Sequence, residues 1–168
     1  MLKYSALAAI AFAAATPAFA QEAPSLSGGH IEAIAGWDHG KFSGVGSDDG
    51  ILFGVGAGYD FNLTGTFVFG IEGEAALSTV EIAGADAKRD LYAGVRVGTE
   101  VAPGTLLYAK VGYTNQRIAG FNADGLRVGG GLEHRFSNNL FVKGEYRYSN
   151  YELGGARSQL VAALGVRF

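Results

Sequence analysis

The chain has 168 residues, of which 48% are hydrophobic and 17% are charged, and its formal net charge is −3. This mixture is too apolar for a disordered chain, while glycine and charged residues interrupt it too often for helical membrane spans. The chain has no cysteine and no block of basic residues, which excludes a disulfide framework and argues against nucleic acid as a partner.

The first twenty residues predict a cleaved export signal. Lys3 precedes an apolar stretch that runs to Ala15, and Ala18-Phe19-Ala20 fits the small-x-small rule for signal peptidase. We therefore expect a signal peptide over 1–20 and one domain over 21–168. Beyond Ala20 no window approaches 18 consecutive apolar residues, which argues against spanning helices but not against a membrane barrel.

From residue 30 onward, apolar and polar residues alternate with a period of two, which is typical of strands with one apolar face. Helical spacing is hard to find. The pattern predicts an all-β fold with eight strands. Their expected ranges are 30–38, 51–61, 66–77, 90–101, 105–114, 125–136, 140–149 and 158–168.

The links between these segments alternate between long and short. Consecutive antiparallel strands turn at opposite ends of a sheet, so the alternation predicts an antiparallel up-and-down barrel with one looped end and one tight end. Turn residues such as Asn62, Gly65 and Gly104 lie in the short links. The expected long links are 39–50, 78–89, 115–124 and 150–157.

The two faces of the predicted strands differ in kind. The face that carries Phe53, Phe69, Val95 and Leu164 contains no Asp, Glu, Lys or Arg, while the opposite face carries 16 charged residues and many glycines. Side chains just fill the interior of an eight-stranded barrel, so the bulky apolar face would overpack it. A Lys or Arg facing lipid at mid-membrane costs about 2–4 kcal/mol. We therefore expect a transmembrane barrel with charges inside and apolar residues against lipid.

Charges inside a narrow lumen are expected to pair, because a buried charge without its partner costs about 3–5 kcal/mol. We predict a network of ion pairs that plugs the lumen, although the sequence does not indicate which acid meets which base. Its expected members are Glu32, Glu72, Glu74, Arg96, Lys110, Arg127, Glu133, Lys143, Glu145 and Arg147.

The last nine residues, 160–168, carry outward apolar residues at alternate positions and end in an aromatic residue. With this ending and the eight alternating segments, residues 28–168 resemble the small eight-stranded outer-membrane barrels of Gram-negative bacteria. That group includes the OmpA transmembrane domain, OmpX and the opacity-type porin-like proteins. The resemblance implies a location in the outer membrane and recognition of the ending by the barrel assembly machinery. The recognition residues would be Leu160, Leu164, Val166 and Phe168.

The sequence offers no convincing catalytic motif. Some barrels that resemble this chain are lipid A deacylases or palmitoyltransferases, which need a serine with a histidine near the looped end. His39 lies at that end but precedes Gly40 in a predicted loop, where it would be poorly held for catalysis. We interpret His30 and His134 as surface or interfacial residues. We therefore predict no enzyme, no cofactor and no metal site. The serines expected at the looped end include Ser43, Ser78 and Ser149.

Five cations at the looped end are predicted to contact the phosphates of lipopolysaccharide through charge-assisted hydrogen bonds. They are Lys41, Lys88, Arg89, Arg117 and Arg157.

These features predict a structural, surface-exposed component of the envelope, with outer-membrane lipid as its partner and the assembly machinery as its partner during biogenesis. The alternative is a narrow porin whose charged lumen passes small ions or solutes when some pairs open. A soluble lipid-binding barrel is a further alternative, but it needs an apolar cavity, and the inward charges oppose it.

Overall fold

A computed structural model describes residues 27–42, 46–82, 85–118, 121–152 and 154–168. The predicted signal peptide, residues 1–20, lies outside these ranges, and its cleavage stays a prediction. The described residues contain no helix that is long and apolar enough to cross a membrane.

The described residues form eight long antiparallel strands that close into a barrel, which confirms the predicted fold class. Each long strand pairs with its neighbours along the chain, and the β1–β9 pairing joins the first strand to the last. A two-residue strand, β4 (Glu81–Ile82), pairs with the start of β5. The long strands are β1 (Gly28–Phe42), β2 (Gly46–Thr64), β3 (Phe67–Ser78), β5 (Ala85–Ala102), β6 (Thr105–Ile118), β7 (Phe121–Arg135), β8 (Leu140–Tyr151) and β9 (Gly155–Arg167).

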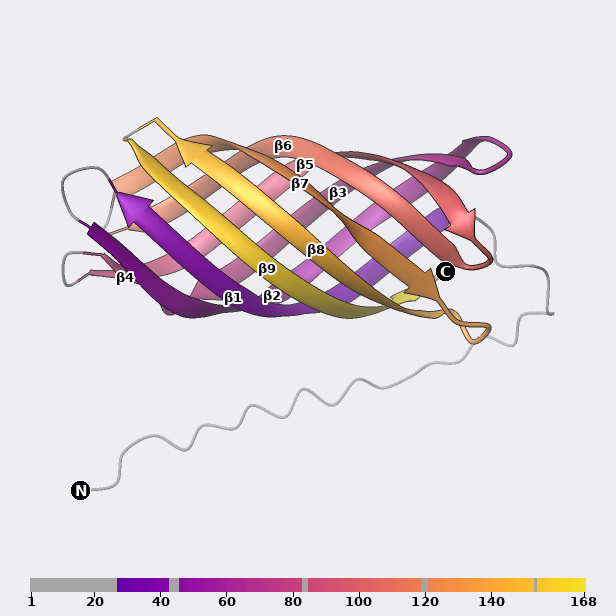
Figure 1. Cartoon of the computed structure of the whole chain (residues 1–168), viewed down its shortest axis with the longest axis horizontal. Helices are drawn as coiled ribbons and strands as arrows, with labels where there is room; N and C mark the ends of the chain where they lie inside the picture. The colour runs from indigo at the N-terminus through magenta and orange to yellow at the C-terminus, as the bar shows by residue number, and fades with distance from the viewer. Residues whose placement is uncertain (1–26, 43–45, 83–84, 119–120, 153) are drawn as a thin grey trace, which may run out of the picture.

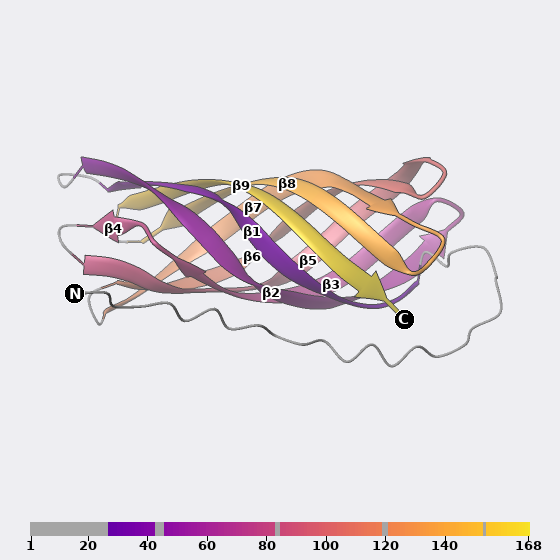
Figure 2. The same ribbon diagram turned by 90° about the horizontal axis from the view of Figure 1, so that it is seen from below.

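The strands are inclined to the long axis of an elongated barrel (Figures 1 and 2). The beginning of β1 and the end of the chain lie together, because Gly29 and Phe168 exchange two backbone hydrogen bonds of 2.9 Å. We call this the turn end, since it also holds the links β2–β3, β5–β6 and β7–β8. The opposite end, where β4 lies, is the loop end (Figure 1).

The links at the turn end are short, as predicted, and their chemistry explains their geometry. Gly65, Gly104 and Asn139 have φ values of 55°, 71° and 64°, in the left-handed region that glycine and asparagine tolerate best. The side chain of Asn62 donates a hydrogen bond to the carbonyl of Gly65 at 3.2 Å and braces the first turn.

The prediction of long loops at the opposite end is wrong. Strand pairing continues through most of the four expected links, for example with His39 opposite Asp49 and Lys41 opposite Ser47. The ladder is held by backbone hydrogen bonds, which do not require an apolar face. Polar residues occupy both faces of the strands there, so the hydrophobic period that identifies a strand in the sequence is lost.

The predicted orientation of the two faces is confirmed. Val97 and Leu164 on the outer wall are 55% and 57% exposed, whereas Arg96 in the lumen is 1% exposed. The alternative of a soluble lipid-binding barrel is wrong, because such a barrel needs its apolar face inside. The lumen also holds a small apolar cluster that includes Ile34, Leu52 and Val161, which the sequence analysis did not predict.

Candidate functional site

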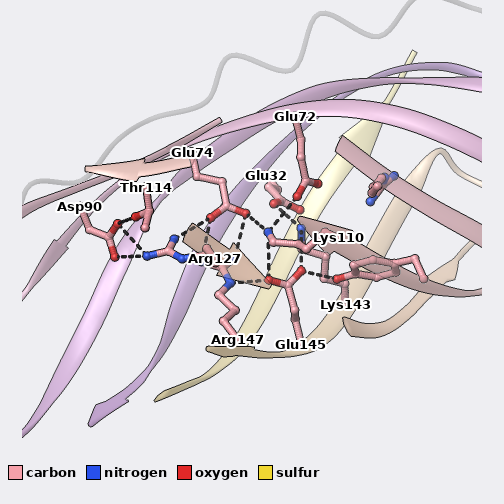
Figure 3. Close-up of polar contacts among 12 residues, drawn as sticks. Glu32, Glu72, Glu74, Asp90, Lys110, Thr114, Arg127, Lys143, Glu145 and Arg147 are labelled. Atoms are coloured by element: carbon pink, nitrogen blue, oxygen red, sulfur yellow. Dashed lines mark hydrogen bonds and ion pairs between the residues drawn. The ribbon is translucent and has the colours of Figure 1, made fainter. Parts of the chain in front are cut away.

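The candidate site is the charged lumen, which contains all ten residues of the predicted network. Strand alternation directs their side chains inward, and each takes part in at least one ion pair. The pairs group into three clusters along the barrel. The central cluster comprises Glu32, Glu72, Glu74, Lys110, Lys143, Glu145 and Arg147 (Figure 3).

Lys110 on β6 is the hub of the central cluster. Its Nζ lies 2.7 Å from Glu74 Oε1, 2.8 Å from Glu72 Oε1 and 3.0 Å from Glu145 Oε1. These carboxylates come from β3 and β8, so the lysine ties three walls of the barrel together (Figure 3).

The other two cations of the central cluster come from β8. Lys143 Nζ lies 2.5 Å from Glu32 Oε1 on β1. Arg147 Nη1 lies 2.7 Å from Glu74 Oε2, and its Nε pairs with Glu145. The β8 side chains thus reach across the lumen to β1 and β3.

The central cluster contains four carboxylates and three cations. Lys110 lies close to Glu72, yet neither Glu72 oxygen receives a well-directed hydrogen bond from any residue that the structure describes. Glu72 thus attracts the Lys110 ammonium by its charge, but the two groups are not oriented for a hydrogen bond. Glu72 is therefore the least firmly held carboxylate of the cluster.

A second cluster lies in the lumen at the turn end. Arg96 lies 2.5 Å from Asp60 and 3.0 Å from Glu133, and Arg167 lies 2.7 Å and 2.9 Å from the same two carboxylates. Two arginines and two carboxylates thus form a closed ring in which every charge has two opposite neighbours.

A third cluster lies towards the loop end. Arg127 Nη2 lies 2.6 Å from Asp90 Oδ2, and Arg127 Nε donates to Ser149 Oγ at 2.8 Å. Arg157 pairs with Asp38 and is 1% exposed. The structure therefore contradicts the predicted place of Arg157 on the outer surface. Its strand begins at Gly155, so Arg157 shares the inward parity of the residues that follow it in β9.

Two tyrosines connect the three clusters. The ring of Tyr108 has Arg96 of the turn-end cluster 5.3 Å and Lys143 of the central cluster 5.9 Å from its centroid. The ring of Tyr92 has Lys110 at 4.4 Å and Arg127 of the loop-end cluster at 5.4 Å. Cations at such distances are attracted to the ring face. The sequence analysis missed both tyrosines, although their inward parity, shared with Asp90 and Lys110, was a usable signal.

The three histidines have Asp60, Asp49 and Thr105 as polar neighbours rather than a described serine. His30 is 1% exposed at the turn end, with Nδ1 3.8 Å from Asp60 Oδ2, so its interpretation as a surface or interfacial residue is wrong. His39 pairs with Asp49 at 2.7 Å, and His134 contacts Thr105 at 2.9 Å. Ser43 lies outside the described residues. Ser78 donates to Asp38, and Ser149 accepts from Arg127.

The other predicted residues whose side chains the structure describes lie on the outer wall. Lys41 and Arg117 are exposed at the loop end, Arg89 is half-buried there, and the side chain of Lys88 lies outside the described part of the structure. The expected assembly residues face outward along β9 and just beyond it, with exposed fractions from 37% to 71%. They are Leu160, Leu164, Val166 and Phe168.

Within the described residues, no group of three or more His, Cys, Asp or Glu side chains has the arrangement of a metal site. The three clusters instead consist of acids and bases that compensate one another.

Comparison with known proteins agrees with this architecture. The sequence matches the family described as outer membrane protein beta-barrel domain over residues 5–168. None of the curated proteins matches the chain.

Solved structures share the fold at low sequence identity. Neisserial surface protein A is 20% identical, with 84% of this chain and 98% of that chain covered and a TM-score of 0.64. Ail, the attachment invasion locus protein of Yersinia pestis, is 16% identical, with coverages of 84% and 99% and a TM-score of 0.60. The outer membrane enzyme PagL is 16% identical, with coverages of 83% and 99% and a TM-score of 0.55. At these identities the likeness concerns the fold alone.

Proposed function

The chain belongs to the outer membrane protein β-barrel family, and on that premise we propose that it is a structural, surface-exposed component of the outer membrane whose lumen is plugged by ion pairs. The observation that carries this proposal is the continuity of polar contacts along the lumen. The turn-end ring, the central cluster and the loop-end cluster follow one another, and Tyr108 and Tyr92 lie between them. A barrel filled in this way seals the membrane that it spans.

The sharing of partners supports a plug that stays closed. Glu145 pairs with Lys110 and Arg147 and accepts a 2.5 Å hydrogen bond from the Tyr108 hydroxyl. Moving any one of these groups leaves the others buried with fewer partners, at a cost of about 3–5 kcal/mol for a charge that loses its pairing altogether. Thermal opening of the whole path would require several such losses together.

The direction of insertion and the assembly signal are parts of the same proposal. We propose that the turn end faces the periplasm and the loop end faces outward. The outward row of Leu160, Leu164, Val166 and Phe168 on the last strand would be read by the barrel assembly machinery. Their exposure on the wall is consistent with contact by another protein during insertion.

Planar-bilayer recording with the purified protein tests the plug. We expect no channel openings from the wild type. The double variant Tyr92→Ala/Tyr108→Ala removes the two rings between the clusters and should produce openings, which also shows that the protein inserts in the assay. Heat-dependent migration on a gel confirms that both proteins are folded. Frequent openings of the folded wild type would contradict the plug.

A narrow porin is the second candidate, and the excess carboxylate of the central cluster favours it. A lumen with Glu72 loosely held would attract small cations. This candidate predicts cation-selective openings of the wild type and a change in conductance when Arg96 or Arg127 is neutralised.

The proposed role uses no catalytic residue. PagL has a similar fold and is an enzyme, but fold similarity does not carry a reaction with it. We therefore predict that the purified protein leaves the ester bonds of outer-membrane lipids intact.

A further inference from the structure

Two arginines face each other on the outer wall at the loop end. Arg89 on β5 and Arg117 on β6 are direct cross-strand partners. Both point away from the lumen, because the next residues, Asp90 and Gln116, are buried inside it with exposed fractions of 2% and 0%. Arg117 is exposed, and Arg89 is half-buried.

Like charges placed directly opposite one another destabilise a pair of strands. Arg89 Nη2 donates to Asn115 Oδ1 at 2.8 Å, a neutral partner that leaves the charge uncompensated. Its buried Nε has no hydrogen-bond partner, and Arg117 has no ion pair among the described side chains. In the lumen, by contrast, the charge of Arg96 is compensated, because Arg96 lies between two carboxylates. Neither wall arginine therefore has an ion-pair partner among the described side chains.

The neighbouring acid, Asp124, is hydrogen-bonded to residues other than the two arginines. Asp124 Oδ1 accepts hydrogen bonds from the Tyr113 hydroxyl at 2.5 Å and from Asn115 Nδ2 at 2.6 Å.

The depth of the pair on the wall indicates the kind of anion. Leu91 on β5 lies two residues nearer the turn end than Arg89, and Tyr113 on β6 lies four residues nearer the turn end than Arg117. Both belong to the apolar belt, and Tyr113 is 54% exposed. Two strand residues span about 7 Å. The guanidinium groups therefore lie just beyond the apolar belt, at the level of lipid headgroups and on the loop-end side of Tyr113, an aromatic residue of the kind typical of the membrane interface.

The strand geometry beside the pair is irregular. The β5–β6 register shifts between Ala87 and Arg89. Such bulges commonly re-aim a side chain next to a functional site. Here the shift falls directly beside Arg89 at the edge of the belt.

We propose that Arg89 and Arg117 together bind a phosphate group on the headgroup of an outer-leaflet lipid. A guanidinium presents two parallel N–H groups to phosphate oxygens, so two facing guanidinium groups match one phosphate from both sides. The proposal rests on the proposed orientation, in which the loop end faces outward. Of the five predicted cations, the site uses Arg89 and Arg117, while the side chain of Lys88 lies outside the described part of the structure. Arg157 is inside the lumen, and Lys41 lies on β1 between Ser47 and Ala156, neither of which is charged.

Lipid retention tests the site. The protein is reconstituted in nanodiscs of phosphatidylcholine that contain either lipid A or lipid A without its phosphate groups, then extracted in detergent, and the lipid that stays bound is counted by native mass spectrometry. We expect the wild type to retain the phosphorylated form at least about tenfold better. The double variant Arg89→Gln/Arg117→Gln should lose this preference.

The matched control is Lys41→Gln, which removes a cation from the same rim but from another part of the wall. It should keep the preference of the wild type. Arg117→Lys keeps the charge and loses the planar fork, so it should retain only part of the preference. Inorganic phosphate at millimolar concentration should not displace the lipid, since the apolar belt beneath the site contributes to holding it.

Three results would overturn the proposal. They are no preference in the wild type, an unchanged preference in the folded double variant, and an equal loss in Lys41→Gln. Displacement by inorganic phosphate would show an anion site that does not select a lipid. None of these results depends on conductance, so failure of the lipid site and failure of the lumen plug are separate outcomes.

Discussion

The lumen and the outer wall are made from alternate residues of the same strands, yet they solve the same packing problem in different ways. In the lumen, long charged side chains lie beside glycines, and partners such as Glu74 and Arg147 come from distant parts of the chain. On the wall, apolar side chains such as Val97 face lipid and do not need a specific partner side chain. The difference indicates that stability is specific and pairwise inside the barrel but generic outside it.

The largest expected effect is the loss of one arginine from the turn-end ring. In Arg96→Met, Asp60 and Glu133 stay buried and keep Arg167 as the described cation within 3 Å of both, while His30 and Arg135 lie farther away, at 3.8 Å and 3.9 Å. We expect the free energy of unfolding to fall by about 3–5 kcal/mol. Urea unfolding in lipid vesicles, followed by the fluorescence of the single tryptophan, Trp37, measures it. The control Arg117→Met removes an exposed arginine and should change the free energy by less than about 1 kcal/mol.

A loss below about 1 kcal/mol in Arg96→Met would mean that the ring is not a cooperative unit. The claim that specific ion pairs stabilise the lumen would then be wrong for the turn-end ring, where every charge has two opposite neighbours.

A charge placed on the wall should have the next largest effect. Val97→Arg puts a cation against lipid midway along the outward apolar row of β5, between Leu91 and Val101, and we expect a loss of about 2–4 kcal/mol in the same unfolding measurement. Asn150→Arg puts the same side chain at the loop end of β8, where the cost should be about 0–1 kcal/mol. Equal costs at the two positions would show that the apolar belt does not coincide with the lipid.

Two glycine substitutions compare the room available on the two faces. A Cβ at Gly54 would point into the lumen and lie 2.7 Å from both Cα and Cβ of Ala76, so Gly54→Ala should cost about 1–3 kcal/mol. A Cβ at Gly144 on the wall would meet no described atom within 4 Å. Gly144→Ala should therefore be neutral or stabilise by about 0.4–1 kcal/mol. Unfolding midpoints measured side by side decide this, and the reverse order would contradict the assignment of faces.

The smallest effect is expected from Glu72→Gln. The substitution leaves three carboxylates and three cations in the central cluster, and Lys110 keeps Glu74 and Glu145 as partners. The free energy of unfolding should change by less than about 1 kcal/mol. Glu145→Gln is the comparison, because it weakens contacts to three cations, Lys110, Lys143 and Arg147, and should cost several times more. Equal losses would show that Glu72 is as firmly held as Glu145.

Much of this architecture follows from the sequence alone. The period of two predicts strands, and the absence of any charge from one set of alternate positions predicts which face meets lipid. Turn residues such as Gly65 and Gly104 predict the tight end. These properties depend on neighbouring residues, and a single chain displays them directly.

Local patterns failed where both faces of a strand are polar. The segments expected as long loops continue as paired strands, because backbone hydrogen bonds extend a ladder without any hydrophobic period. The error placed Arg157 on the surface, whereas the parity of β9 directs it into the lumen. It also concealed that Arg89 and Arg117 are direct partners on adjoining strands.

The sequence by itself determined that charges face inward and that they must pair, since both follow from alternation and from the cost of an unpaired buried charge. Only the tertiary structure decided which charges meet. Closure of the barrel brings β3 opposite β8 and places Glu74 beside Arg147, 73 residues further along the chain. The same closure sets Tyr92 and Tyr108 between successive clusters. Contacts across a lumen depend on how eight strands are staggered around it, and that stagger is a property of the whole sheet rather than of any one segment.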